Sequence, residues 1–222
     1  FQNAIEIVQA HVPKEVREYV ACLLQNRNIV IRVSRPRRTK IGDHRPPSRR
    51  YLYHRISVNE DLNPYAFLIT LLHEIAHADV WEAFRGKRVH PKPHGVEWKN
   101  AFRELLAPLV DAHSFPSEVT VALDQYMWNP SATSCSDRNL VLALAQYDDQ
   151  KRSRMRVEDI PIGRIFRTTT GRTFCRGTKA RTRFLCVEQQ TGLEFHVHAL
   201  ADAELVNVSD SLFIDSITKL NL

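Results

Sequence analysis

The sequence predicts an α+β protein in two parts, with a first domain over residues 1–150 and a small all-β domain over residues 157–208. Apolar residues recur at helical spacing through most of the first 150 positions, and two alternating segments of β-branched and aromatic residues interrupt them before position 60. Beyond position 157 only short strand-like segments separated by glycines remain. A chain of 222 residues, 43% of them hydrophobic, is long enough to form two cores.

The first domain is predicted to begin with two helices. Apolar residues have helical spacing over residues 3–10 and 14–26, and Pro13 suits the start of the second helix. Strands are expected at Asn28–Ser34 and Tyr51–Val58, where β-branched or aromatic residues alternate with polar ones. Four further helices are predicted, at about 64–85, 94–108, 116–128 and 137–147. Helices packed beside a small sheet are typical of the α+β class.

The second domain is predicted to be a small barrel or meander of short strands. Four strands are expected, at 164–168, 172–175, 182–188 and 194–198. Gly171, Gly177 and Gly192 are expected at turns between them. Residues 151–156 are interpreted as a charged linker or helix end, and residues 209–222 receive no assignment.

Residues 73–77 read His-Glu-Ile-Ala-His and fall in the middle of the helix expected at 64–85. Asn63 before Pro64 is typical of a helix start, and Gly86 is typical of a helix end. Because residues four apart lie on one face of a helix, the two histidines can bind one ion. The alternative is a pair of polar residues on the exposed side of an amphipathic helix, but the residues around this pair are strongly apolar.

A catalytic zinc site requires a third protein ligand in addition to His73 and His77. Val80 and Ala83 stand where the short-spaced zinc-protease layout needs Gly and His, so that layout is excluded. Three candidates follow in the sequence, namely His90, His94 and Glu97. Sequence distance alone does not separate Glu97 from His94.

Residues 73–78 (His-Glu-Ile-Ala-His-Ala) and 94–99 (His-Gly-Val-Glu-Trp-Lys) together resemble the two motifs of the SprT-like, Spartan-related zinc metalloproteases. The resemblance covers roughly residues 25–110. It implies a zincin-like metalloprotease domain that contains the His-Glu-x-x-His helix and cleaves protein substrates. Eukaryotic members of this family degrade proteins crosslinked to DNA, so the resemblance also implies work on or near nucleic acid.

The resemblance implies a role for each matching residue. The implied ligands of a Zn²⁺ cofactor are His73, His77 and His94. Glu74 would be the catalytic base, Glu97 and Trp98 would pack around the site, and His90 would lie at its rim. Zinc lowers the pKa of bound water from ~15.7 to about 7, and Glu74 would accept a proton as the water attacks a peptide carbonyl. Amide hydrolysis without a covalent intermediate is the expected reaction.

Residues near the helix in sequence have weaker functional signals. No residue is assigned to stabilise the developing oxyanion, since Tyr51, Tyr53, His54 and Arg55 are each expected to be structural. A strand beside the motif helix would allow an extended substrate to bind by β-addition.

The cysteines mark a departure from the family. Several SprT-like proteins carry a zinc ribbon built on C-x-x-C pairs after the protease domain. The four cysteines here form no such pair, since they stand at Cys22, Cys135, Cys175 and Cys186. A second site built from the last three with His196 fits no ribbon spacing, and reduced, mostly buried thiols are expected instead.

Positive charge is concentrated in two blocks, although the net charge is only +6. Residues 32–50 hold eight Lys or Arg against Asp43 alone, a net +7, and residues 151–183 hold eleven against Glu158 and Asp159, a net +9. The remaining 170 residues therefore carry a net −10. This asymmetry favours surfaces that bind DNA or another nucleic acid over a merely solvated face. The residues expected to bind are Arg35, Arg37, Arg38, Lys40, Arg45, Arg49, Arg50, Arg176, Lys179, Arg181 and Arg183.

Aromatic residues accompany both basic blocks. Tyr51 and Tyr53 follow the first, and Phe166, Phe174 and Phe184 lie within the second. Aromatic rings can stack on bases, but alternating Phe residues in strands more often form a core.

Two functions remain. The favoured one is a zinc metalloendopeptidase that acts on proteins attached to or near nucleic acid. The alternative is a non-enzymatic nucleic-acid-binding protein with a structural zinc site, which would have no use for Glu74 beside a ligand. No run of 18 or more apolar residues occurs, so no membrane span is expected. The start lacks the basic segment of a secretory signal, so a cytoplasmic location is expected.

Overall fold

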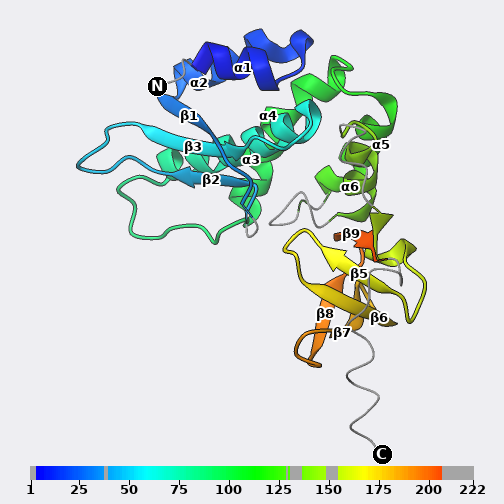
Figure 1. The fold of residues 1–222 in the computed structure, drawn as a ribbon. Coiled ribbons are helices and arrows are strands. Elements are labelled where there is room, and N and C mark those ends of the chain that lie inside the picture. Colours follow the sequence, from blue (N-terminus) through cyan, green and yellow to red (C-terminus); the bar gives the residue numbers. More distant parts are fainter. Residues whose placement is uncertain (1–3, 38–39, 129, 131–136, 149–154, 207–222) are drawn as a thin grey trace, which may run out of the picture. The chain divides into compact units, whose positions relative to one another are not determined.

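The computed structural model describes residues 4–37, 40–128, 130, 137–148 and 155–206. The chain divides into two compact units, residues 1–149 and 150–222. The first contains helices and a three-stranded sheet, and the second contains a six-stranded sheet (Figure 1). The predicted α+β class is therefore confirmed. Within the described ranges, no helix is both long enough and apolar enough to cross a membrane.

The first unit begins with helices that pack on a small sheet. The helices are α1 (Ala4–His11), the 3-10 turn η1 (Lys14–Val16) and α2 (Arg17–Asn26). The strands are β1 (Ile29–Ser34), β2 (Gly42–Arg45) and β3 (His54–Asn59), in the order β1-β3-β2. β1 is parallel to β3, and β2 is antiparallel to β3 at the edge of the sheet.

The edge strand β2 corrects the sequence interpretation. No strand was predicted between the segments 28–34 and 51–58, where Pro36, Pro46 and Pro47 make the basic block loop-like. Gly42-Asp43-His44-Arg45 has a low intrinsic preference for strands, and its pairing with β3 creates the strand. The strand expected at 51–58 also begins later, at His54.

The helices of the motif region follow their local signals. They are α3 (Pro64–Ala83), α4 (Val96–Asp111), α5 (Ser117–Trp128) and α6 (Arg138–Ala145). The Asn63 side chain accepts a hydrogen bond from the Ala66 amide at 2.9 Å, and Asp137 caps α6 in the same way. Gly86 has a φ of 76°, a conformation that suits glycine after a helix end. The helix expected from residue 94 begins at Val96 instead.

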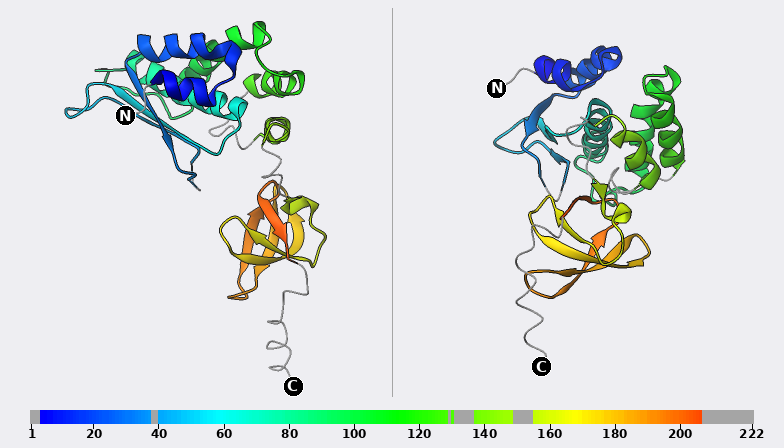
Figure 2. Two further views of the ribbon diagram at one scale, coloured as in Figure 1. Left: turned by 45° about the horizontal axis from the view of Figure 1, so that its top comes forward. Right: turned by 45° about the vertical axis from the view of Figure 1, so that its right-hand side comes forward.

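Helix α3 lies inside the core of the first unit. Its residues 67–76 are all buried, because α4 packs on one side of it and β2 and β3 pack on another (Figure 2). A helix that is apolar on every side is stable only in such a position. The His-Glu-x-x-His residues therefore lie at the boundary between the sheet and α4.

The second unit is an antiparallel sheet in the order β4-β9-β5-β6-β7-β8. Its strands are β4 (Met155–Arg156), β5 (Ile165–Thr168), β6 (Thr173–Ala180), β7 (Arg183–Glu188), β8 (Glu194–His198) and β9 (Asp202–Leu205), with the 3-10 turn η4 (Val157–Asp159) after β4. Phe166, Phe174 and Phe184 are buried in its core, so these rings do not offer a stacking surface.

The strands β4 and β9 were not predicted, since both are short and form by pairing with each other. Gly177 was expected at a turn, and this was wrong. It lies inside β6, where the pairing with β7 shifts register between Arg176 and Lys179. A Cβ at Gly177 would lie 2.2 Å from the Leu185 carbonyl oxygen, so the bulge requires glycine. Residues 151–154 and 209–222 lie outside the described residues.

Candidate metal centre

Three imidazoles converge near the middle of α3. His73 and His77 lie one turn apart on the helix, and His94 comes from the loop before α4. The Nε2 atoms of His73 and His94 are 3.1 Å apart, and those of His77 and His94 are 3.0 Å apart. Among the described residues, these three histidines form a group whose potential ligand atoms lie close enough together to hold one metal ion.

The spacing of these nitrogens suits a cation. Zn–N distances of about 2.0–2.1 Å in a tetrahedral site place ligand nitrogens about 3.3 Å apart, close to the separations here. Burial, together with the neighbouring imidazoles, lowers the pKa of His73 and of His77 to about 3, so both rings are neutral at physiological pH. Three neutral rings that share one point cannot satisfy each other by hydrogen bonds alone, whereas an ion can accept a lone pair from each.

The loop before α4 presents the third imidazole. His94 has a φ of 55°, and the Gly95 amide donates to the Lys92 carbonyl in the preceding turn. A Cβ at Gly95 would lie 2.9 Å from that same carbonyl oxygen, so the tight turn requires glycine. Neither His90 nor Glu97 joins the imidazole group among the described residues.

Trp98 supports all three imidazoles from α4. Its ring is fully buried, with its centroid 4.4 Å from that of His73, 5.5 Å from His77 and 4.7 Å from His94. Its indole N–H donates to the His73 carbonyl oxygen at 3.3 Å. Trp98 therefore fixes the orientation of the three imidazole rings and does not face solvent.

Glu74 is buried beside the imidazoles and faces the edge strand. A Cβ at Gly42 would lie 2.3 Å from Glu74 Oε1, so glycine is needed on β2 to leave room for the carboxylate. Burial, followed by the charge of Asp43, raises the pKa of Glu74 to about 7, although Arg37, Lys40 and a hydrogen bond from the His44 amide act in the opposite direction. The carboxyl group is therefore suited to exchange a proton near neutral pH.

A chain of hydrogen bonds that sequence analysis missed leads to the same centre. His44 Nε2 lies 2.9 Å from His54 Nδ1, and His54 Nε2 lies 3.0 Å from Glu82 Oε1. In the neutral tautomer that donates from Nε2 to the Glu82 carboxylate, His54 Nδ1 accepts from His44 Nε2. The His44 ring is stacked parallel to that of His77, with centroids 6.3 Å apart. These residues come from three elements, so no local pattern could have revealed them.

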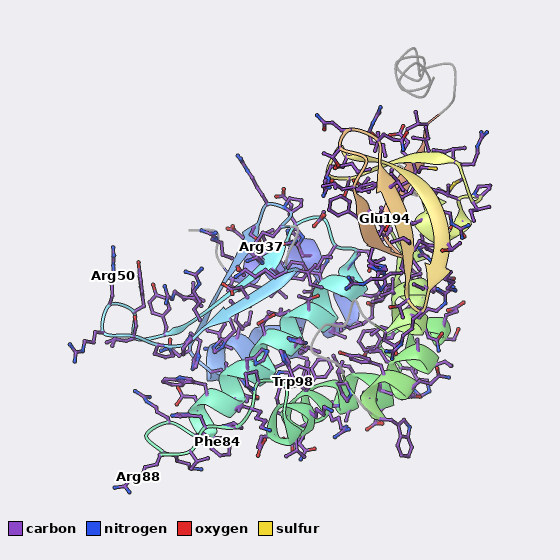
Figure 3. All side chains as sticks on the ribbon, turned by 90° about the horizontal axis from the view of Figure 1, so that it is seen from below. Arg37, Arg50, Phe84, Arg88, Trp98 and Glu194 are labelled. Atoms are coloured by element: carbon purple, nitrogen blue, oxygen red, sulfur yellow. The ribbon has the colours of Figure 1, made fainter. Side chains whose placement is uncertain are left out.

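A pocket of about 240 Å³ opens beside the imidazoles. His44, His77, His90 and His94 line it. Trp98 and Phe84, both labelled in Figure 3, complete its apolar wall. The pocket gives the three-imidazole group access to solvent on one side.

The basic residues of the first block divide into two groups. Arg35, Lys40, Arg45, Arg49 and Arg50 are exposed, and Lys40 and Arg45 both form ion pairs with Asp43. Arg37 is half-buried (Figure 3) and donates to Asn59, Ser57 and Ile41, so its guanidinium is committed to the fold. Arg38 lies outside the described residues.

The basic residues of the second block lie on the β6–β7 hairpin. Lys179, Arg181 and Arg183 are exposed, with Arg181 at the turn in a positive-φ conformation. Arg176 is half-buried, with its guanidinium carbon 4.0 Å from the centroid of the Phe184 ring. Cys175, Cys186 and His196 form no metal-binding group within the described ranges, and Cys135 lies outside them.

The fold and the site together define an α+β protein with a buried three-histidine group that could hold a metal ion. No family model, curated protein or solved structure matches this chain.

Proposed function

We propose that the first unit is a zincin-like, SprT-like metallopeptidase domain that uses Zn²⁺ to hydrolyse peptide bonds. The observation that carries the proposal is the convergence of the three imidazole Nε2 atoms beside the buried carboxyl group of Glu74. Imidazole nitrogens suit zinc, and three protein ligands leave one position of a tetrahedral ion open, as in catalytic zinc sites. A bound zinc ion would polarise a carbonyl oxygen and lower the pKa of water to about 7.

Glu74 would move the proton that the reaction requires. Its carboxylate accepts a proton from the attacking water as the new C–O bond forms at the peptide carbonyl. The same carboxyl group then delivers this proton to the amide nitrogen as the C–N bond breaks. A pKa of about 7 suits both transfers at neutral pH.

The edge strand β2 offers a place for an extended substrate. The Asn59 amide donates to the Ile41 carbonyl across the β2–β3 pair. In an antiparallel pair every second residue forms inter-strand hydrogen bonds, so the backbone groups of Asp43 and Arg45 also point at β3. The backbone groups of Gly42 and the carbonyl of His44 then point to the open edge, whereas the His44 amide donates to the Glu74 carboxyl group. A peptide could pair with them as an additional strand, with its scissile bond near the imidazoles.

The proposed substrates are proteins attached to or near nucleic acid, including proteins crosslinked to DNA. The two basic blocks and the resemblance of the motifs to the SprT-like family support this part of the proposal. The rival function, a nucleic-acid-binding protein with structural zinc, is disfavoured by Glu74. A buried carboxyl group costs free energy, and a structural site gains nothing from it.

Replacement of Glu74 by Gln tests the enzyme directly. Glu74→Gln should retain about one zinc per chain, since it leaves all three imidazoles in place, and should reduce casein cleavage by at least about 100-fold because the proton acceptor is lost. Metal analysis and a casein assay measure the two effects. Glu104→Gln, an exposed carboxylate on α4, is the matched control and should behave as the wild type. Turnover that survives in Glu74→Gln, or a wild-type protein that binds no zinc, would contradict the proposal.

A further inference from the structure

A second charged surface lies on the face of the three-stranded sheet that is turned away from α3. Gly42 and His44 point toward α3, so Asp43 and Arg45 point to the opposite face. The register with β3 adds Arg55 to this face. The parallel register of β1 with β3 adds Arg32 beside Ser57. We call the surface formed by Arg32, Arg45, Arg55, Tyr51 and Tyr53 the open face.

The open face is hollow rather than flat. A depression of about 450 Å³ lies over it, and all five of its defining residues line this depression. Arg32 and Arg45 are exposed, while Arg55, Tyr51 and Tyr53 are half-buried. A depression of this size accommodates a chain of small groups rather than a folded domain.

The arrangement of arginines on the open face lowers the stability of the folded protein. Arg45 and Arg55 are direct cross-strand partners, and like charges in that position destabilise a sheet. The Nε atom of Arg55 is buried and has no hydrogen-bond partner among the described residues. A buried guanidinium donor without an acceptor costs further free energy. A bound anion over this face would offset the repulsion between the Arg45 and Arg55 guanidiniums.

The protein itself supplies little negative charge on this surface. The acidic residue that lines the depression is Asp43, which already pairs with Lys40 at 2.6 Å and with Arg45 at 3.0 Å. Tyr51 contributes an aromatic ring, and the Arg55 guanidinium carbon lies 4.3 Å from its centroid. The net positive charge therefore remains available to a ligand.

We infer that the open face binds single-stranded nucleic acid through its phosphates. Neighbouring strands are about 4.8 Å apart, so the arginines of β1, β3 and β2 spread over roughly 10 Å, farther than one phosphate reaches. A polymer of phosphates meets all three guanidiniums, and Arg binds phosphate oxygens in bidentate geometry. The half-buried ring of Tyr53 offers a surface on which an unpaired base stacks. Because the bases of a duplex are already paired and stacked, only a single strand presents an unpaired base to this ring.

The position of the open face explains why the two sites share one sheet. On β2, the side chain of His44 lines the pocket of the imidazoles and the next side chain, Arg45, lines the open face. A nucleic-acid strand bound there would pass behind the strand that borders the metal centre. The idea that bound nucleic acid brings attached proteins to the imidazole group rests on the proposed peptidase function. The binding of nucleic acid to the open face does not depend on that function.

The test measures binding of a fluorescent 20-residue oligothymidylate to the full chain by polarisation at several salt concentrations. The double variant Arg32→Thr/Arg55→Thr should bind at least about tenfold more weakly, and the slope of log K against log salt should fall by about 1.4, because two phosphate contacts are lost. Its thermal midpoint should remain within about 2 °C of the wild type, since a repulsive pair is removed. Lys14→Thr/Arg88→Thr removes the same charge at exposed positions elsewhere and should bind as the wild type.

Three results would overturn the inference. The double variant could bind as tightly as its control, a duplex of the same length could bind as tightly as the single strand, or polyglutamate could compete as well as the oligonucleotide. If the double variant proves unstable, the exposed single change Arg32→Thr repeats the test with an expected slope change of about 0.7. Glu74→Gln should bind the oligonucleotide normally, so failure of the peptidase proposal and failure of this inference are distinguishable.

Discussion

The central residues of the first unit are ionisable groups held in environments that oppose their charge. His73 and Glu74 are each only 7% exposed, although both have polar side chains. Burial favours the neutral form of both, so it lowers the pKa of the imidazole and raises that of the carboxyl group. A fold that stores such groups is less stable than one with apolar residues in their place, and this cost is typical of a functional site.

These opposed shifts predict how stability depends on pH in the metal-free protein. The pKa of His44 is lowered to about 4 and those of His73 and His77 to about 3, so the unfolded chain binds more protons below pH 6.5 and the folded state loses stability there. Between pH 7.5 and pH 5.5 each histidine costs about 1.4 kcal/mol. Glu74, with its pKa raised to about 7, takes up a proton in the folded state over this interval and so stabilises the folded state by about 2 kcal/mol. The free energy of unfolding should therefore fall by about 2 kcal/mol.

Urea unfolding of the metal-free protein at the two pH values measures this change. Glu74→Gln removes the compensating proton, so its free energy of unfolding should fall by about 4 kcal/mol over the same interval. If the variant and the wild type respond equally to pH, the raised pKa of Glu74 is wrong.

At the scale of elements, the edge strand β2 connects the two proposed sites. It has four residues, and its stability comes from the antiparallel pairing with β3. Gly42 and His44 border the metal centre, and Arg45 lies on the open face. The close approach of β2 to α3 depends on the absence of a side chain at residue 42, because the Glu74 carboxylate occupies that space.

Gly42→Ala should therefore separate catalysis from metal binding. The new Cβ would lie 2.3 Å from Glu74 Oε1, so the carboxylate or the strand must move. We expect kcat for casein to fall at least about tenfold, which corresponds to about 1.4 kcal/mol, while the zinc content stays at one per chain. Steady-state kinetics and metal analysis measure the two quantities.

Gly171→Ala is the control for this substitution. It replaces a glycine of positive φ in the second unit where a Cβ meets nothing within 4 Å, so it lowers stability without touching the site. Equal activity of Gly42→Ala and the wild type would show that the carboxylate does not depend on the space left by Gly42.

At the scale of the whole molecule, the chain forms two separate cores. The first is built around α3 with residues from α1 to α6, and the second is built from the inward-facing residues of the β-unit, including Phe166, Phe174 and Phe184. Each core is contiguous in sequence, with the boundary at residues 149–150. Two such units are expected to unfold as separate cooperative transitions.

Removal of the metal should affect the first transition alone. Trp81, Trp98 and Trp128 all lie in the first unit, so tryptophan fluorescence reports its unfolding, whereas calorimetry detects both units. Zinc at about 100 times its Kd should stabilise the first unit by about 2.7 kcal/mol, and excess chelator should reverse this. A chelator-dependent shift in the calorimetric transition without a matching shift in fluorescence would place the zinc in the second unit and contradict the assignment.

Sequence information was sufficient where structure depends on neighbouring residues. The cap at Asn63, the i,i+4 pair of histidines and the stop at Gly86 are local signals, and the helix that they predict was confirmed over Pro64–Ala83. The strands β2, β4 and β9 escaped prediction, because short strands are stabilised by partners distant in sequence.

The sequence by itself determined the α+β class, the approximate positions of the long helices and the presence of two histidines and a glutamate on one helix turn. The tertiary structure decided which later residue approaches them, because distance along the chain did not separate His94 from Glu97 and the turn at residues 92–95 places His94 against α3. It also decided that His44, His54 and Glu82 form one hydrogen-bonded chain and that Arg45 faces Arg55. Contacts of this kind arise from strand register and packing, which no local pattern of residues encodes.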